Sequence, residues 1–458
     1  MTAYFDAALI DKYAMSGPRY TSYPTAVQFT DAFGNDEYIA ALQASNEEGR
    51  DLSLYVHIPF CRHVCYFCAC NKIITRNTAQ AEEYLRYLRM DIKRQAEHID
   101  RDRKVVQLHF GGGTPTFISK EEQTELLGML HEQFNFVGDE EGEFSIEIDP
   151  RTVDHDYLAH LRSLGFNRVS FGVQDFDPAV QEAVNRVQPL EDVEAVMRSS
   201  RELGYHSISV DLIYGLPLQT VDKFRQTLRE VIRLSPDRIA VFNYAHMPHL
   251  FGAQKQINDG DLPDSDTKLG ILRSTIEMLT EAGYEFIGLD HFAKPDDSLV
   301  HHQKNGTLYR NFQGYSTFSE CDLLGFGVSA ISMLKNSYNQ HQKARSKYYA
   351  ELDAGGLPVE RGVPLSEDDH IRGYAITEIM CNLKLSLEAV SERFNIDAQA
   401  YFAEEWQRLE PFAKDGLIRL DEVGLTVEPI GRLLIRNIAM IFDAYLRELP
   451  QKRFSKVI

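Results

Sequence analysis

The chain has 458 residues, of which 43% are hydrophobic and 25% charged, values that lie within the range of ordinary globular proteins. These values exclude disordered, collagenous and low-complexity classes, and the length predicts one large domain or two to three ordinary ones. Acidic side chains outnumber basic ones by 68 to 48, and the net charge of −20 argues against a broad nucleic-acid-binding face.

The N-terminal region carries no targeting pattern. Its first 20 residues lack a basic segment followed by an apolar one, and the most apolar later stretch, residues 323–334, is short and broken by glycines. We therefore expect no membrane span and a cytoplasmic location. Residues 1–45 include the turn-rich sequence SGPRYTSYPTA at 16–26, so we expect an N-terminal arm laid over the core.

Short apolar runs alternate with helical patterns through most of the chain. The predicted strands are residues 52–58, 105–110, 144–148, 168–173, 208–212 and 238–243, with a further one possible at 286–289. The predicted helices between them include residues 79–98, 120–134, 193–203, 223–234 and 267–283. This alternation predicts parallel strands joined by right-handed crossovers, either as an open doubly wound sheet or as a full or partial barrel.

Polar residues gather where the predicted strands end. They are Glu147, Asp149, Gln174, Asp175, Asp211 and residues 243–246. Strands that converge on one mouth favour a barrel over an open sheet. Helical patterns dominate from about residue 335, at 344–352, 371–381, 398–413 and 431–446. We therefore predict an arm at 1–45, an α/β barrel at 46–335 and a mainly helical domain at 336–458.

Four of the six cysteines lie within ten residues, and three of them form the pattern Cys61-x3-Cys65-x2-Cys68 directly after the first predicted strand. Three thiolates on one short loop can bind three irons of a cubane cluster, which leaves the fourth iron open to a small chelating ligand. A structural zinc needs four ligands, and Cys70 or His63 would have to supply the fourth. Cys321 and Cys381 stand in apolar surroundings and are interpreted as small core residues.

The cysteine pattern, with an aromatic residue before its last cysteine, resembles that of the radical S-adenosylmethionine enzymes. The resemblance implies that the cluster donates an electron to the sulfonium and releases methionine and a 5′-deoxyadenosyl radical. The run Gly111-Gly112-Gly113 resembles the motif that holds the methionyl amino group in that superfamily. A plain tight turn is the alternative, and Thr114-Pro115 after the third glycine disfavours a dinucleotide fingerprint.

The resemblance extends over the whole chain to the bacterial oxygen-independent coproporphyrinogen III oxidases. The matching segments include residues 16–26, 54–73, 108–116, 165–168, 172–176, 211–217, 241–246, 310–315, 323–333 and 431–437. The family implies a partial, six-unit (β/α) barrel with a mainly helical C-terminal domain. It also implies oxidative decarboxylation of two propionates of coproporphyrinogen III to vinyl groups, which gives protoporphyrinogen IX in haem biosynthesis.

The resemblance also assigns site residues. Cys61, Cys65 and Cys68 would bind a [4Fe-4S] cluster. One S-adenosylmethionine would meet Tyr55, Gly112, Glu147 and Ile331, with Tyr55 and Glu147 positioning the cofactor rather than acting as acid or base. A second S-adenosylmethionine would meet Phe67, Gly113, Thr114, Gln174, Arg186, Asp211 and Ala245. Cys70 is placed near the substrate or the second cofactor without assigned chemistry.

The substrate of that family carries four carboxylates, so we expect local basic residues in this acidic chain. Arg19 and Arg310 are the first candidates, with Arg432 and Arg436 behind them, and surface or interdomain salt bridges are the alternative. The family further implies a monomer, with an electron donor and a terminal acceptor that the sequence does not identify. Three other functions stay open: a haem-binding or haem-delivery protein, a radical enzyme acting on another tetrapyrrole or carboxylate, and a structural zinc module.

Overall fold

The structure is a computed structural model that describes residues 4–447, and the chain divides into two compact units. The described part of the first unit comprises residues 4–28, 273–319 and 365–447. The second unit comprises residues 29–272 and 320–364. The two units are described separately below.

Six parallel strands form the centre of the second unit. They are β1 (Leu52–Ile58), β4 (Lys104–Gly112), β6 (Glu143–Ile148), β7 (Arg168–Gln174), β8 (Ser207–Tyr214) and β9 (Arg238–Asn243). Their order in the sheet is β1-β4-β6-β7-β8-β9, so each strand pairs with the next one in the sequence. This arrangement confirms the predicted partial barrel of six strands.

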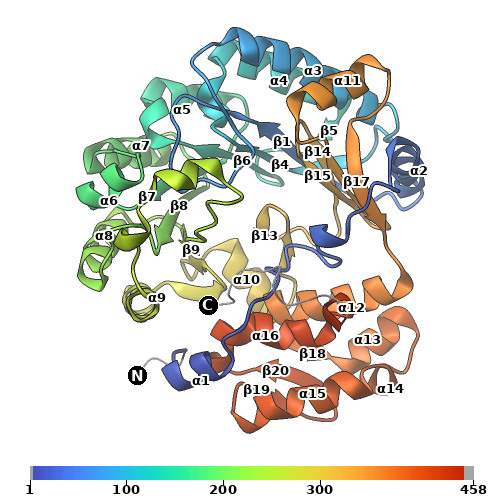
Figure 1. Cartoon of the computed structure of the whole chain (residues 1–458). Helices are drawn as coiled ribbons and strands as arrows, with labels where there is room; N and C mark the ends of the chain where they lie inside the picture. Colours follow the sequence, from blue (N-terminus) through green and yellow to red (C-terminus); the bar gives the residue numbers. More distant parts are fainter. Residues whose placement is uncertain (1–3, 448–458) are drawn as a thin grey trace. The chain divides into compact units, whose positions relative to one another are not determined.

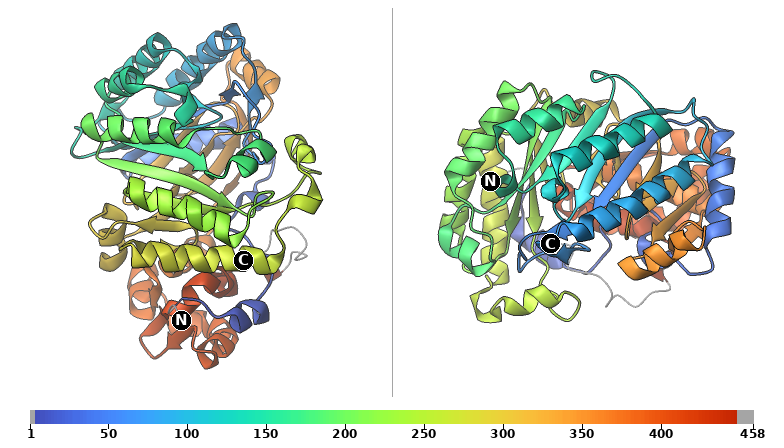
Figure 2. Two further views of the ribbon diagram at one scale, coloured as in Figure 1. Left: turned by 90° about the vertical axis from the view of Figure 1, so that its left-hand side faces the viewer. Right: turned by 90° about the horizontal axis from the view of Figure 1, so that it is seen from above.

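Helices follow these strands and cover the outer face of the curved sheet, as Figures 1 and 2 show for the second unit. They are α3 (Ala79–Ala96), α4 (Lys120–Gln133), α5 (His155–Ser163), α6 (Pro178–Ala183), α7 (Leu190–Glu202) and α8 (Val221–Leu234). Helix α9 (Ser265–Glu281) begins in the second unit and ends in the first. Helix α8 illustrates why they form. The Thr220 hydroxyl caps its first turn, and Phe224, Leu228 and Val231 recur at helical spacing as fully buried residues.

Burial alternates along the strands, and this alternation sets where the polar side chains point. In β6, Phe144, Ile146 and Ile148 are buried, whereas Ser145 and Glu147 between them are only partly buried. Successive side chains of a strand point to opposite faces of the sheet. The apolar set therefore packs under the helices, and the polar set faces the inside of the barrel.

The sheet of the second unit continues beyond β1 in a way that the sequence did not predict. The additional strands are β14 (Asp322–Phe326), β15 (Ile331–Leu334), β16 (Ser337–His341) and β17 (Val359–Pro364), and only β14 pairs in parallel, with β1. Strand β16 is polar in sequence, yet Asn339, Gln340 and His341 are all buried in it. Because its residues are polar, the sequence pattern did not indicate a buried strand here. Helices α2 (Asn35–Asn46) and α11 (Arg345–Asp353) also belong to this unit, and the predicted boundaries at residues 45 and 335 stay predictions.

The first unit is mainly helical. Its helices are α1 (Ala7–Lys12), α10 (Ser298–Asn305), α12 (Glu367–Thr377), α13 (Leu387–Phe394), α14 (Ala398–Tyr401), α15 (Ala403–Lys414) and α16 (Ile435–Ala439). Its strands are β10 (Glu285–Gly288), β11 (His291–Ala293), β12 (Tyr309–Asn311), β13 (Gly314–Ser316), β18 (Lys384–Ser386), β19 (Ile418–Leu420) and β20 (Gly424–Val427). The single helix expected at residues 431–446 is instead split into α16 and short turns of 3-10 helix.

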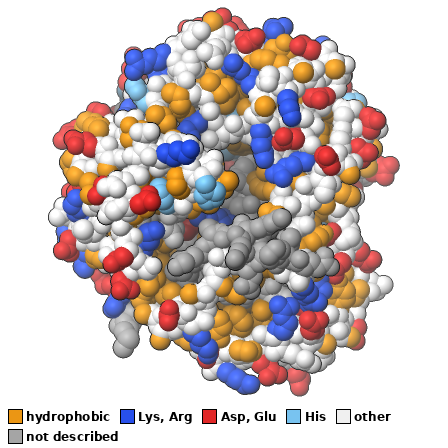
Figure 3. Space-filling model, viewed as in Figure 1, with side chains coloured by type: hydrophobic (Ala, Val, Ile, Leu, Met, Phe, Trp, Pro, Cys, Tyr) orange, Lys and Arg blue, Asp and Glu red, His pale blue; other side chains and the backbone are white. Residues whose placement is uncertain are grey.

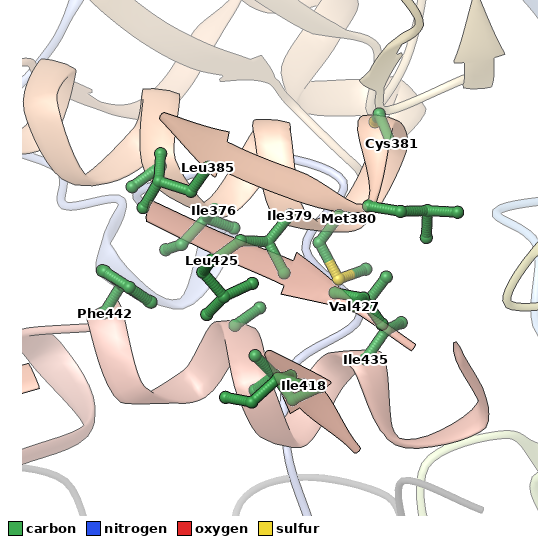
Figure 4. Packing of buried hydrophobic residues seen from close by; sticks show 14 of the residues in the cluster. Ile376, Ile379, Met380, Cys381, Leu385, Ile418, Leu425, Val427, Ile435 and Phe442 are labelled. Carbon is green, nitrogen blue, oxygen red and sulfur yellow. The ribbon is translucent and has the colours of Figure 1, made fainter. Parts of the chain in front are cut away.

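An apolar core holds the helical part of the first unit together. Figure 4 shows Ile376, Ile379, Leu425, Ile435 and Phe442 directed at one another from α12, β20, α16 and the turns beside them. Cys381 is fully buried in this cluster, as expected of a small core residue. Cys321 is only partly buried.

Charge is distributed without a dominant sign over the surface that Figure 3 displays. Basic and acidic side chains are interspersed on that face. Within residues 4–447, no helix is both long enough and apolar enough to cross a lipid bilayer.

Candidate functional site

The cysteine loop, residues 61–70, leaves the end of β1 and is fastened to the rest of the second unit through its backbone. The Tyr66 amide donates to the Val184 carbonyl at 3.0 Å, and the Asn185 side-chain amide donates to the Val64 carbonyl at 2.7 Å. Within the loop, the Cys68 amide donates to the Cys65 carbonyl at 3.2 Å. These hydrogen bonds fasten the loop to the segment that follows α6.

Polar neighbours reach the cysteine sulfurs. The Thr114 hydroxyl donates to Cys61 Sγ at 3.4 Å, and Arg186 Nη1 donates to Cys65 Sγ at 3.4 Å. Burial raises the pKa of Cys61 to about 11, although the Thr114 hydrogen bond acts to lower it. A hydrogen bond from Cys70 lowers the pKa of the Cys68 thiol, and the same bond raises the pKa of Cys70. The hydrogen bonds to Cys61 and Cys68 thus favour their thiolate forms, which are the forms that bind metal, whereas burial opposes this at Cys61.

The spacing of the sulfurs distinguishes between kinds of metal site. Thiolates bound to one zinc at about 2.3 Å would lie roughly 3.8 Å apart. Among the described residues, the cysteines form no set of three whose ligand atoms all lie within 4.8 Å of one another.

The glycine run at the end of β4 approaches the end of β1, just before the cysteine loop, so closely that side chains would not fit. Gly112 has a φ of +113°, and a Cβ there would lie 2.7 Å from the His57 ring. A Cβ on Gly113 would lie 2.7 Å from the Pro59 backbone carbon. Glycine thus lets the backbone of the run pack directly against the end of β1, where the Gly113 amide donates to the Ile58 carbonyl at 2.8 Å. The role that the resemblance assigned to the run stays a prediction.

Glu147 lies beside this glycine run. Its carboxylate accepts from the Gly112 amide at 3.3 Å and lies 3.2 Å from His109 Nε2. Burial alone would raise the pKa of Glu147, but the His109 and Gly112 hydrogen bonds outweigh it and the pKa is lowered. The carboxylate is thus ionised at neutral pH and can accept hydrogen bonds from an ammonium or hydroxyl group.

Tyr55 and Ile331 lie near Glu147 through neighbouring strands. The Tyr55 ring stacks on the His109 ring with centroids 5.9 Å apart, and its hydroxyl lies 3.0 Å from His57 Nδ1. Tyr55 pairs with Gly325 of β14, where a Cβ would lie 2.6 Å from the Ile331 carbonyl oxygen. The structure thus brings together the residues expected around the first S-adenosylmethionine.

A second set gathers at the ends of β7 and β8. Gln174 has a φ of +68°, and Arg186 Nη2 donates to the Gly172 carbonyl at 2.6 Å. Asp211 accepts from the Ser170 hydroxyl at 3.2 Å. Burial and the nearby charge of Glu147 raise the pKa of Asp211 to about 7.

Phe67 and Ala245 complete this second set through a shared partner. The buried Gln254 side chain donates to both backbone carbonyls, at 3.1 Å for Phe67 and 3.2 Å for Ala245. The cysteine loop is therefore linked to the segment after β9. All residues expected around the two cofactors lie in the second unit.

Sequence reasoning did not select several residues that shape this site. They are His57, His109 and Gln254. The period-2 pattern offered a signal for the histidines, because Tyr55 and His57 share one face of a strand, as do His109 and Gly111. No comparable signal marked Gln254, whose contacts join segments far apart in the sequence.

The expected substrate arginines lie in the first unit. Arg310 of β12 pairs with Tyr315 of β13, and its guanidinium lies 4.9 Å from the centre of the Tyr315 ring. Arg432 Nη1 donates to the Phe286 carbonyl at 2.8 Å. The charges of Arg19, Arg310 and Arg436 all act on the carboxyl of Asp290.

Comparisons with known proteins extend over the whole chain. A family model of the radical SAM superfamily matches residues 55–231, and a model of the HemN C-terminal domain matches residues 365–434. A curated oxygen-independent coproporphyrinogen III oxidase of Pseudomonas aeruginosa is 50% identical over 457 residues, which cover 100% of this chain and 99% of that one. A Synechocystis protein of the same name is 46% identical over 462 residues, which cover 100% and 99%.

A solved structure agrees with these matches. The coproporphyrinogen III oxidase of Escherichia coli, described as a radical SAM enzyme, superposes with a TM-score of 0.92 at 48% identity. The match covers 97% of this chain and 100% of that one.

Proposed function

Because the chain belongs to the family of oxygen-independent coproporphyrinogen III oxidases, within the radical SAM superfamily, we propose that it converts coproporphyrinogen III to protoporphyrinogen IX by decarboxylating two propionate side chains. The observation that carries this proposal is the identity of half of all residues over the full length of curated oxidases. The haem-binding and zinc-module alternatives lack a comparable observation.

The family implies a [4Fe-4S] cluster and S-adenosylmethionine, and the residues of the second unit fit both groups. Together these groups supply a 5′-deoxyadenosyl radical that takes a hydrogen atom from the propionate chain. Cys61, Cys65 and Cys68 would hold the cluster. The Glu147 carboxylate and the backbone at Gly112 would hold the polar end of S-adenosylmethionine, and Tyr55 would orient it.

The proposal includes a second S-adenosylmethionine molecule bound to the same chain. Phe67, Gly113, Thr114, Gln174, Arg186, Asp211 and Ala245 would contact it. What supports this assignment is that Gln174, Arg186 and Asp211 gather at the ends of adjacent strands β7 and β8, and that Gln254 links Phe67 with Ala245.

Substrate binding is assigned to the first unit. Arg19 and Arg310 would bind propionate carboxylates, with Arg432 and Arg436 in support. The support is strongest for Arg310, because its Nε and Nη1 atoms are buried and have no hydrogen-bond partner. A guanidinium with buried, unbonded donors is costly unless a ligand satisfies it.

Four further points complete the proposal. Cys70 lies near the substrate or the second cofactor, the protein acts as a monomer in the cytoplasm, and separate proteins or small molecules supply and accept electrons. The hydrogen bond from Cys70 to Cys68 supports the placement of Cys70.

The proposed function is tested by anaerobic incubation of the cluster-loaded protein with reductant, S-adenosylmethionine and coproporphyrinogen III, followed by mass spectrometry. We expect 5′-deoxyadenosine and the loss of two carboxyl groups to appear together and to depend on substrate. Deoxyadenosine without decarboxylation would indicate another substrate. Neither product from a cluster-loaded protein would favour the haem-binding function.

A further inference from the structure

Asp290 occupies the tip of a tight hairpin in the first unit. Gly288 of β10 pairs with His291 of β11, so that Leu289 and Asp290 alone form the turn, and Leu289 has a φ of +52°. A two-residue hairpin turn of this kind holds its tip residues rigidly. The Asp290 carboxylate is therefore presented from a fixed backbone.

Both strands of this hairpin lie against Tyr315, and the Arg310 guanidinium also lies over the Tyr315 ring. A Cβ on Gly288 would lie 2.9 Å from the Tyr315 hydroxyl, and the His291 ring lies edge-on to the Tyr315 ring at 5.1 Å. Arg310 lies over the same ring at 4.9 Å. Tyr315 thus contacts both the hairpin that carries Asp290 and the Arg310 guanidinium, whose charge acts to lower the pKa of Asp290.

Asp290 has no direct partner in spite of these neighbours. Within residues 4–447, its carboxylate takes part in no hydrogen bond and has no Lys, Arg or His nitrogen within 4.0 Å. Burial raises the pKa of Asp290, while the charges of Arg19, Arg310 and Arg436 act to lower it. We call these four residues the Asp290 cluster. Asp290 is partly buried, and Arg310 near it keeps two buried donors, Nε and Nη1, without acceptors. Groups of opposite charge that lie near one another and do not pair, with buried donors left unsatisfied, point to a ligand that binds both.

The Asp290 cluster offers a carboxylate that accepts hydrogen bonds and guanidinium groups that donate them, and one kind of ligand carries both complementary groups. A porphyrinogen carries carboxylates on its rim and pyrrole N–H groups, which are donors, toward its centre. We propose that Asp290 accepts hydrogen bonds from pyrrole N–H groups of the substrate while Arg310 and Arg19 bind its carboxylates. The guanidinium groups of Arg19 and Arg310 outnumber this one carboxylate and leave positive charge for the anionic rim. This inference rests on the proposed function, and it assigns Asp290 to recognition of the tetrapyrrole ring itself.

Two variants separate an acceptor from a mere negative charge. Asp290→Asn keeps an oxygen that accepts hydrogen bonds but removes the charge, and Asp290→Leu has a similar shape and accepts none. Asp296→Asn, at an exposed position on the same unit, is the matched control. We expect the KM for coproporphyrinogen III to rise about 10-fold for Asp290→Asn and about 100-fold for Asp290→Leu, with wild-type values for the control.

The melting temperature of each variant distinguishes ligand binding from a structural role. Removing a partly buried carboxylate without a partner should leave the melting temperature unchanged or raise it, whereas removing a structural carboxylate would lower it. The inference is overturned if KM is unchanged, if Asn and Leu raise it equally, or if KM rises only with a fall in melting temperature. Failure of the wild-type protein to decarboxylate coproporphyrinogen III would instead refute the proposed function.

Discussion

The cysteine loop of the second unit and the Asp290 cluster of the first unit both bring charged side chains together, but they satisfy those side chains differently. Around the loop, Glu147 and Arg186 each bond to neighbouring backbone, at Gly112 N and Gly172 O, and one buried donor, Arg186 Nε, has no acceptor. In the Asp290 cluster, Arg310 keeps two buried donors without acceptors. The difference supports our proposals that the protein itself positions most of the cofactor residues, and that a ligand satisfies the substrate residues.

The largest expected effect comes from removing a cluster ligand. Cys61→Ala should lose iron and the visible absorption of the cluster, and product formation should fall to background, because two thiolates on one loop cannot hold the cubane. Cys321→Ser, outside the loop, is the control and should retain both. Full activity of Cys61→Ala with normal iron content would contradict the cluster assignment.

A smaller effect is expected where the protein only orients a cofactor. Glu147→Gln should raise the KM for S-adenosylmethionine by about 10- to 100-fold, because an ionised acceptor becomes a neutral amide. Iron content should stay normal, which separates this variant from Cys61→Ala. The exposed Glu202→Gln serves as control. An unchanged KM would remove Glu147 from the cofactor site.

The substrate side of the comparison is tested at Arg310. Arg310→Gln should raise the KM for coproporphyrinogen III by about 10-fold or more and leave the KM for S-adenosylmethionine unchanged. Arg19→Gln should act in the same direction. If both variants keep the wild-type KM, the carboxylate site lies elsewhere.

The smallest expected effect concerns the stability of the second unit and its dependence on pH. The folded protein raises the pKa of Asp211 to about 7, so the unfolded chain ionises first and stability falls as pH rises from about 4 to 7. Asp211→Asn does not titrate. Its free energy of unfolding should exceed that of the wild type by about 1–2 kcal/mol at pH 8 and by less at pH 5.

Urea unfolding of the cofactor-free protein at the two pH values measures this difference. Asp102→Asn, at an exposed position, should show no such change with pH. A gain that is equal at both pH values would mean that the Asp211 carboxyl is not perturbed.

Much of the barrel could be predicted because its strands are apolar in sequence. The predicted limits of β1 and β9 coincide with the observed Leu52–Ile58 and Arg238–Asn243. Strand β16 could not be predicted, because its buried side chains are polar and their bonds come from other segments. The pairing of β14 with β1 likewise depends on contacts between residues far apart in the chain.

The candidate site likewise has features that could be predicted from local sequence and features that depend on tertiary contacts. The spacing of Cys61, Cys65 and Cys68 is local and was readable, and the resemblance supplied the remaining cofactor residues. The link through Gln254 and the unpaired state of Asp290 are tertiary facts. No pattern of spacing encodes either of them.

The attachment of the cysteine loop to Val184 and Asn185 affects how the enzyme recovers after oxygen has destroyed its cluster. An exposed cluster with an open iron is easily destroyed by oxygen. Since the backbone bonds of the loop involve no metal, the protein that remains keeps three thiols on a path already defined. Damage should therefore be repaired by supplying iron, sulfide and reductant alone, without unfolding and renewed folding of the chain.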